Sequence, residues 1–415
     1  MENDKQEPSH DGDGAKDADR QTSGPGHESF TPPEAVAKNE ETLNETSTTG
    51  ALDSSPVGPK HWWRRIHLTK KQWIIVGFVT VALIGVGTTT YALLRNPPPK
   101  PVAHKQLKKK VLITAVPTTV PSTLTGLPVT PSVNQRPVTA VMIENSTFAR
   151  PQSGLDQAGV VFEAIAEGGI TRFVALYQDT TPSYVGPVRS VRPYYLQWLL
   201  GFDAAIAHVG GSPEALQDIP NWNVKDLNQF YNSNYFTRIS SRAAPHNVYT
   251  SIAQLNALEA SKGYTTSNFT GFPRKADQPS KTPDAKTINF TLSGPDYNAQ
   301  YQYDPSANDY KRSEGGAPHM EINSAGVQTQ ITPKVVIGMV MTYGLESDDL
   351  HSSYATIGSG PVYIFQDGTV TQGTWHKTSN TAQITFTDSK GATINLNAGY
   401  TWFTALAATS DVSYQ

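Results

Sequence analysis

Arginine, glutamate and histidine residues gather in five short segments between residues 144 and 247, and glycine or proline adjoins most of them. The planar guanidinium of arginine suits carboxylate and phosphate groups, whereas glutamate and histidine are common general acids and bases. Glycine and proline mark places where the backbone bends to aim a side chain. We therefore predict one ligand-binding cleft, formed by Glu144, Arg150, Glu163, Glu167, Arg172, Arg189, Arg192, His208, Gly210, Gly211, Ser212, Arg242 and His246.

The segment from His208 to Ser212 carries two adjacent glycines directly before a predicted helix. Ser212 suits the N-cap position and Pro213 the first helical position. Unpaired backbone N–H groups and the helix dipole favour an anion at such a start, and the glycines let it approach closely. Arg189 and Arg192 lie three residues apart, one helical turn, so both guanidinium groups could face one ligand. These features predict an anionic ligand.

Structural roles stay open for the same residues. Glycine pairs such as Gly168-Gly169 often form plain turns, arginine and glutamate often form ion-pair networks, and His208 and His246 could be hydrogen-bonded structural residues. The sequence contains no H-E-x-x-H metal motif, Walker loop, G-x-S-x-G elbow or dinucleotide fingerprint. We therefore expect no cofactor and no metal site, and the catalytic residues, if any, are unknown.

The elements that would position these residues are predicted from the apolar pattern. Alternating or continuous apolar runs predict strands over residues 137–145, 159–165 and 172–178, and an amphipathic pattern predicts a helix over 251–262. This mixture indicates an α/β-type domain over 136–275. The ends of strands in such a sheet gather at one edge, where ligands usually bind.

Helical periodicity disappears after a polar, proline-containing connector. Short β-rich runs separated by turn signals follow, for example at residues 335–341, 362–365 and 381–386. We expect a second, mostly β domain over 285–408, and the overall fold class is predicted to be α+β.

Charge divides the chain into three blocks. Residues 1–60 carry 13 acidic and 5 basic residues, residues 61–110 carry 10 basic residues and no acidic ones, and the rest has a net charge of −5. Residues 1–59 have few large apolar residues, so they are predicted to be a disordered acidic tail. The mildly acidic folded region argues against nucleic-acid binding, which needs a basic face. The absence of cysteine excludes disulfides and a lipid-modified cysteine in this sequence.

Residues 73–94 form an uncharged stretch of 22 residues, rich in isoleucine, valine and leucine. A helix of this length spans about 33 Å, so the stretch predicts a transmembrane helix that attaches the chain to a membrane. Five basic residues flank it on each side and do not decide its orientation. Residues 95–135 are rich in proline, threonine and lysine and suit a stalk. The stalk favours a cytoplasmic N-terminus and extracytoplasmic folded domains.

Several of these segments carry long motifs: "GPVRSVRPYY", "AHVGGSPEAL" and "RAAPHNVYTS", and later "APHMEI" (317–322), "FQDGTVTQGTWHK" (365–377) and "LNAGYTWF" (396–403). In these motifs the chain resembles the YerB-type "putative lipoprotein" family of bacteria over roughly residues 130–408. The resemblance implies two domains, attachment to the cell envelope and a location outside the cytoplasmic membrane. It implies no activity, ligand or catalytic residue. Family members with a lipobox cysteine differ from this chain, in which the predicted transmembrane helix would replace the lipid anchor.

Two functions follow as hypotheses. The first is a membrane-tethered extracytoplasmic binding or accessory protein, whose arginine-lined cleft holds an anionic envelope polymer or an envelope protein. The second is an envelope hydrolase or transferase, with Glu144, Glu163 or Glu167 as acid or base and His208 or His246 assisting. A His–Glu pair within hydrogen-bond reach favours the enzyme, and arginines lining an open groove favour binding.

Overall fold

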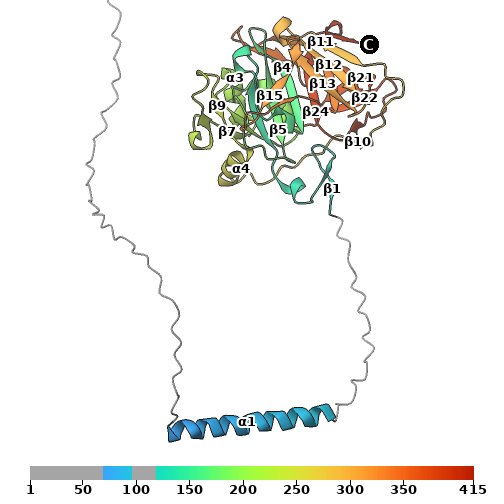
Figure 1. Cartoon of the computed structure of the whole chain (residues 1–415). Helices are drawn as coiled ribbons and strands as arrows, with labels where there is room; N and C mark the ends of the chain where they lie inside the picture. The colour runs from blue at the N-terminus through green and yellow to red at the C-terminus, as the bar shows by residue number, and fades with distance from the viewer. Residues whose placement is uncertain (1–68, 96–117) are drawn as a thin grey trace, which may run out of the picture. The chain divides into compact units, whose positions relative to one another are not determined.

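The computed structural model describes residues 69–95 and 118–415. They belong to two compact units, one ending at Lys108 and the other beginning at Lys109, and each is described here by itself (Figure 1). The predicted acidic tail, residues 1–59, and residues 96–117 of the predicted stalk lie outside the described residues. Residues 118–135 of that predicted stalk belong to the second unit, where Leu124 is buried in the core and Ser122 hydrogen-bonds to Asp179.

The first unit contributes helix α1 (Lys70–Arg95), which covers the uncharged stretch. Within the two described ranges, no helix is both long enough and apolar enough to span a membrane. The predicted transmembrane helix over 73–94, and with it the single-pass membrane attachment, is therefore wrong. Glycine and threonine interrupt the apolar residues of α1, and the hydroxyls of Thr88, Thr89 and Thr90 donate to backbone carbonyls one turn earlier.

A ten-stranded sheet forms the centre of the second unit. Its strands are, in spatial order, β22 (Thr385–Asp388), β21 (Thr369–Lys377), β20 (Gly358–Gln366), β17 (Val335–Val340), β24 (Thr401–Leu406), β4 (Val160–Glu167), β5 (Ile170–Tyr177), β3 (Thr139–Glu144), β6 (Ala205–His208) and β7 (Lys225–Asn228). The red-orange β24 and the green β4 run side by side in Figure 1, and they pair in parallel from Thr401↔Val160 to Thr404↔Glu163. One sheet therefore crosses the boundary between the predicted domains 136–275 and 285–408, a division that stays a prediction.

The fold is mostly β, which corrects the predicted α+β order of a mixed α/β domain followed by a mostly β domain. The described residues contain four α-helices: α1, α2 (Pro193–Leu200), α3 (Pro213–Asn221) and α4 (Ile252–Ser261). Three of them have ten residues or fewer. The predicted fold class is wrong for two physical reasons. Interior strands that are buried on both faces read as continuous apolar runs, and the strands that pair with them are remote in sequence.

Smaller sheets surround the central one. A five-stranded antiparallel sheet has the order β14 (Ala317–Pro318), β13 (Asp309–Glu314), β12 (Ala299–Asp304), β11 (Thr287–Phe290) and β25 (Val412–Tyr414). The remaining strands form two-stranded pairs: β1 (Val120–Pro121) with β2 (Pro128–Val129), β8 (Thr237–Arg238) with β9 (Val248–Tyr249), β10 (Arg274–Lys275) with β23 (Leu396–Asn397), β15 (Met320–Ile322) with β16 (Gln328–Gln330), and β18 (Tyr343–Leu345) with β19 (Ser352–Tyr354).

The central sheet separates two hydrophobic cores. Ala140 and Met142 of β3 pack into one core with the aromatic residues of α2, whereas Val141 and Ile143 pack into the other with α4 and the five-stranded sheet. Side chains alternate between the faces of a strand, so neighbouring residues enter different cores. Charged residues on β4 and β5 follow the same rule, and this decides which of them can meet.

Candidate functional site

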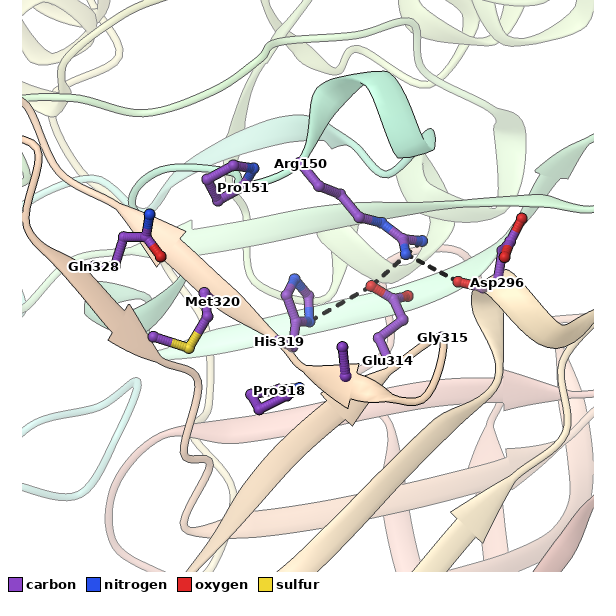
Figure 2. A pocket seen from close by; sticks show the side chains of 10 residues that line it. Arg150, Pro151, Asp296, Glu314, Gly315, Pro318, His319, Met320 and Gln328 are labelled. Carbon is purple, nitrogen blue, oxygen red and sulfur yellow. Dashed lines mark hydrogen bonds and ion pairs between the residues drawn. The ribbon is translucent and has the colours of Figure 1, made fainter.

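A cleft of about 350 Å³ lies beside the segment that follows β3. Figure 2 shows its side chains, which come from this segment, from the loop before β12, and from β13 to β16. The lining residues are Arg150, Pro151, Asp296, Glu314, Gly315, Ala317, Pro318, His319, Met320 and Gln328. The cleft thus joins the two predicted domains and is lined by arginine, glutamate and histidine.

Arg150 is held at the cleft by neutral acceptors. Its Nε donates to Asn145 Oδ1 at 3.1 Å, one terminal nitrogen donates to the Asn145 carbonyl at 3.2 Å, and the other donates to the Asp296 carbonyl at 2.9 Å. The guanidinium also lies 5.2 Å from the ring centroid of Tyr297. Because these groups fix its orientation and 21 % of its side chain stays exposed, Arg150 presents a positive charge to the cleft.

Glu314 lies beneath Arg150 and is almost fully buried. Its Oε1 accepts a hydrogen bond from Asn145 Nδ2 at 2.6 Å, and its Oε2 lies 3.4 Å from an Arg150 nitrogen but has no hydrogen-bond partner within residues 69–95 and 118–415. Burial raises the pKa of Glu314, although the charges of Arg312 and Arg150 oppose the shift. The cleft therefore contains a buried carboxyl oxygen that approaches Arg150 at 3.4 Å and His319 Nδ1 at 3.7 Å.

His319 is the third polar residue considered at the cleft, and its imidazole is neutral. Its Nδ1 accepts a hydrogen bond from Arg312, which leaves Nε2 to donate to Gln152 Oε1 at 3.1 Å. Burial and the positive charges of Arg312 and Arg150 hold the pKa of His319 well below its usual value. A neutral imidazole adds no charge, so Arg150 and Glu314 set the electrostatics of the cleft.

An ion pair between Glu163 and Arg312 lies in the core behind the cleft. Arg312 donates to both Glu163 oxygens at 2.9 and 2.8 Å, and neither side chain is exposed. Trp402 Nε1 also donates to Glu163 at 3.0 Å, and the Arg312 guanidinium lies 4.5 Å from the Trp402 ring centroid. This pair joins β4, β13 and β24, and its complete burial makes it part of the core.

A second polar group surrounds Glu144 at the end of β3. Glu144 Oε1 lies 2.8 Å from His246 Nδ1, accepts from the Ser146 hydroxyl at 2.9 Å, and is 3.4 Å from Arg189 Nε. The carboxylate is buried, whereas His246 and Arg189 are partly exposed. The Glu144 carbonyl accepts from Gln152 Nε2 at 3.2 Å, which connects this group to the cleft.

Arg242 holds the backbone on both sides of Arg150. It donates to the carbonyls of Ala149 and Pro151, the latter at 2.7 Å, on either side of Arg150. Of the predicted residues, Glu144 and Arg150 therefore lie on one segment, and Arg242 and His246 contact that segment from a second one.

Glu167, Arg172 and Arg192 form a separate cluster. Glu167 binds both arginines at 2.5 Å, and both arginines are almost fully buried. Burial tends to raise the pKa of Glu167, but the charges of Arg172 and Arg192 outweigh it and the pKa is lowered. Arg172 belongs to the face of Val174, which contacts the first core, whereas Glu163 belongs to the face of Val161, which contacts the second. The sheet separates this cluster from the Glu163–Arg312 pair.

His208 and the glycine turn also lie apart from the cleft. His208 is fully buried, with Nε2 2.9 Å from Asp226 Oδ1 and Nδ1 2.7 Å from the Gly210 carbonyl. Ser212 caps α3 as predicted by accepting from the Ala215 amide at 3.3 Å, and Gly211 packs against Val191. The structure thus divides the thirteen predicted residues among several positions, and their role in ligand binding stays a prediction.

The sequence reasoning missed Arg312, Glu314 and His319. One signal could have found the first two: Tyr310, Arg312 and Glu314 alternate with exposed or half-exposed residues along β13 and all face inward. Inward charges on a strand indicate either a buried ion pair or a site. His319 lies within the "APHMEI" motif, which supported the family resemblance but carried no chemical role.

Comparisons with known proteins agree with that resemblance. The chain matches the family described as "Protein of unknown function (DUF3048)", its N-terminal domain over residues 124–265 and its C-terminal domain over residues 288–403. The chain belongs to this family, and the predicted YerB-type membership is confirmed.

Two relatives show the extent of the likeness. The chain is 35 % identical over 197 residues to "Putative lipoprotein YerB" of Bacillus subtilis (strain 168), a match that covers 46 % of this chain and 60 % of the relative. It is also similar to the crystal structure of the YerB protein from Bacillus subtilis, with a TM-score of 0.64 and 27 % identity over 71 % of this chain and 99 % of that chain.

Proposed function

We propose that this protein is an extracytoplasmic binding protein of the bacterial cell envelope, and that its cleft at Arg150 holds an anionic group of an envelope component. Similarity to a protein named as a lipoprotein supports the location. The chemistry of the cleft supports the ligand class, which is a carboxylate or a phosphate.

This proposal rests on the N–H donors of Arg150 that can still bind a ligand. Arginine has five N–H donors, and three of those of Arg150 are used by neutral oxygens of Asn145 and Asp296. Burial raises the pKa of the neighbouring Glu314, whose Oε2 lies 3.4 Å from an Arg150 nitrogen. Arg150 keeps one further N–H on each terminal nitrogen, and these donors can bind a ligand oxygen.

The test is a calorimetric titration of the full chain with inorganic phosphate, glycerol phosphate and a soluble disaccharide-peptide fragment of peptidoglycan. Arg150→Ala is expected to weaken binding of the preferred probe by about 1.5–3 kcal/mol, roughly tenfold to a hundredfold. Arg136→Ala is the matched control, because Arg136 is exposed and does not line the cleft. Absence of saturable binding to all three probes, or equal losses in both variants, would refute the proposal.

The Glu144–His246 pair favours hydrolase or transferase activity as a second candidate. Glu144 Oε1 contacts Nδ1 at 2.8 Å, as a carboxylate does when it orients a catalytic imidazole whose Nε2 acts as the base. Ser146 is not placed as a nucleophile on Nε2, since its hydroxyl is bonded to Glu144 and lies 3.4 Å from Nδ1. A water molecule would therefore be the group that is activated.

The other acid–base candidates have less suitable surroundings. Glu163 is fully buried against Arg312, Glu167 is held between two arginines, and His208 is fully buried. Mass spectrometry of the titrated peptidoglycan fragment distinguishes the two functions. Cleavage that is lost in His246→Ala and kept in Arg150→Ala would favour the enzyme, whereas an intact fragment would favour binding.

A further inference from the structure

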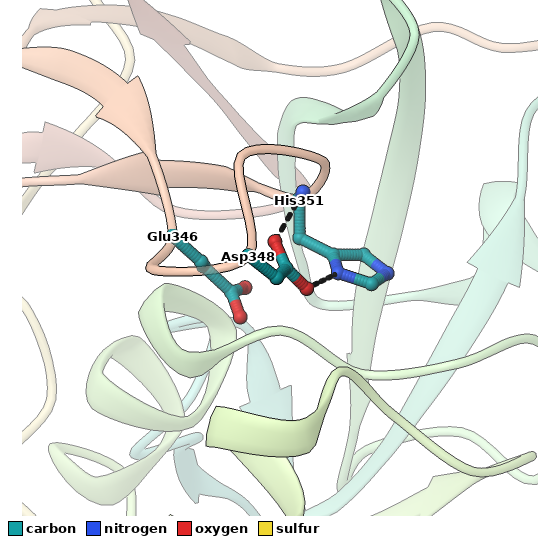
Figure 3. A group of neighbouring side chains, drawn as sticks. All are labelled: Glu346, Asp348 and His351. Carbon is teal, nitrogen blue, oxygen red and sulfur yellow. Dashed lines mark hydrogen bonds and ion pairs between the residues drawn. The ribbon is translucent and has the colours of Figure 1, made fainter.

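The hairpin formed by β18 and β19 gathers three metal-binding residue types at its tip. Glu346, Asp348 and His351 each offer one donor atom, and these atoms lie within 4.8 Å of one another (Figure 3). The turn is fixed by its backbone, because the Glu346 amide donates to the His351 carbonyl at 2.7 Å and Asp349 adopts a positive φ of 55°. Neither the binding cleft nor the Glu144–His246 group includes these residues.

An independent observation at the Glu346 carboxylate also points to a cation. Only 6 % of Glu346 is exposed, and its Oε1 accepts a hydrogen bond from the Ser212 hydroxyl at 3.0 Å. Its Oε2 is buried and has no hydrogen-bond partner in the part of the chain that the structure describes, although an unsatisfied buried acceptor is unfavourable. Figure 3 shows this carboxylate turned toward Asp348. A cation between the two side chains would satisfy Oε2.

Asp348 and His351 complete the group from the more accessible side of the hairpin. Asp348 Oδ1 accepts from the amides of Leu350 and His351 at 3.0 Å each, and Oδ2 lies 2.5 Å from His351 Nδ1. Their side chains are 31 % and 17 % exposed, so an ion could reach them and keep bound water.

The surrounding charges are mixed but include a further acid. Glu214, His351 and Arg192 are charged or titratable side chains close enough to act on Glu346, and Ser212 donates a hydrogen bond to it. Glu167 also approaches through a β-bridge between its backbone and that of His351, but its carboxylate is occupied by Arg172 and Arg192. The carboxyl groups of Glu346 and Asp348 therefore remain for a cation, with Glu214 nearby and Arg192 opposing it.

We propose that Glu346, Asp348 and His351 bind one divalent first-row transition-metal ion. Two carboxylates and one imidazole form a mixed oxygen and nitrogen set, which suits Zn²⁺ or Mn²⁺ better than the all-oxygen ligand sets of Ca²⁺. With metal–ligand bonds of about 2.1 Å, two ligands of one ion lie at most about 4.2 Å apart. A small closing movement of the side chains therefore suffices, and the ion replaces the contact between Asp348 and His351.

A bound ion would connect the hairpin to the start of α3. Glu346 contacts both the proposed ion and Ser212, the N-cap of α3. Since an ion that binds only the folded state stabilises it, the melting temperature should rise with the metal concentration.

The experiment is calorimetry and thermal unfolding of the untagged full chain with Zn²⁺, Mn²⁺ and Ca²⁺. The wild type should bind one Zn²⁺ or Mn²⁺ per chain and unfold at a higher temperature when it is bound. Glu346→Gln keeps the oxygen that accepts from Ser212, and His351→Ala removes the imidazole; each should weaken transition-metal binding at least tenfold. His376→Ala is the matched control, because His376 lies on β21 and contacts Thr387.

Unfolding of each variant without metal shows whether it is folded, and Asp348→Asn replaces any variant that is not. No Zn²⁺ or Mn²⁺ binding by the wild type would overturn the proposal. Wild-type affinity in both Glu346→Gln and His351→Ala, or a stronger response to Ca²⁺ than to either transition metal, would also overturn it. Phosphate binding at Arg150 is measured separately, so this result does not depend on the proposed function.

Discussion

Two glutamates of strand β4 have opposite surroundings, although each pairs with arginine. Glu163 and Arg312 are fully buried, and they come from segments 149 residues apart. Glu167 is 27 % exposed, and its partners Arg172 and Arg192 lie 5 and 25 residues away in the sequence. The difference shows that a charged residue on a strand has no fixed meaning. The face it occupies and the remote strand that covers it decide whether it belongs to the core or stays within reach of solvent.

Breaking the buried Glu163–Arg312 pair should cause the largest loss of stability. Arg312→Ala leaves Glu163 buried without its charge partner, so we expect a loss of about 3–5 kcal/mol in the free energy of unfolding. Urea denaturation of the full chain, followed by tryptophan fluorescence and circular dichroism, measures the loss. The double variant Glu163→Gln with Arg312→Met is the control and should lose less than the single variant, because it leaves no isolated charge. A loss under about 1 kcal/mol for Arg312→Ala would contradict the view that this pair is a core element.

The cluster of Glu167, Arg172 and Arg192 should give an intermediate effect on the free energy of unfolding, and this effect should depend on pH. Glu167→Gln removes two charge-assisted hydrogen bonds, and partial exposure reduces the expected loss at pH 7 to about 1–2 kcal/mol. The pKa of Glu167 is lowered in the folded state, so its ionised form stabilises the fold fully above about pH 4.5. This contribution is lost as the pH falls through the lowered pKa. Urea denaturation at several pH values should therefore show the two proteins converging in acid, and a constant difference would argue against this linkage.

The sequence predicted local elements better than their partners. Strands expected at 137–145, 159–165 and 172–178 correspond to β3, β4 and β5, and Ser212 caps α3. These features depend on nearby residues, so the periodicity and capping rules could detect them. The parallel pairing of β24 with β4 depends on residues about 240 positions apart, and no local pattern encodes it. For the same reason the sequence could not show that Arg312 is the partner of Glu163.

The predicted single cleft illustrates the same limit. It assumed that residues near strand ends converge at one sheet edge, which holds for parallel α/β sheets. Here β4 and β5 are antiparallel, and Glu163 and Arg172 occupy opposite faces of their hairpin. Arg150 does line a cleft, but its neighbours Glu314 and His319 come from the second half of the chain. Residue type indicated the chemistry, and only the tertiary structure could assign the partners.

Replacing Arg189 should give the smallest loss in the free energy of unfolding. It tests whether burial, rather than charge pairing, decides how much an ion pair contributes to stability. Its Nε lies 3.4 Å from Glu144 Oε1 and makes no hydrogen bond, and a quarter of its side chain is exposed. Glu144 keeps Ser146 and His246 as partners when Arg189 is removed. Arg189→Ala should therefore lower the free energy of unfolding by less than about 1 kcal/mol, the range of exposed ion pairs.

Salt provides the control for this last prediction. Salt at 1 M shortens the Debye length to about 3 Å and should remove most of the difference between Arg189→Ala and the wild type. The large loss in Arg312→Ala should persist at the same salt concentration, because solvent ions do not reach the Glu163–Arg312 pair. Urea denaturation of both variants at low and high salt makes the comparison. If Arg189→Ala were as damaging as Arg312→Ala at both salt concentrations, burial could not be what distinguishes the two ion pairs.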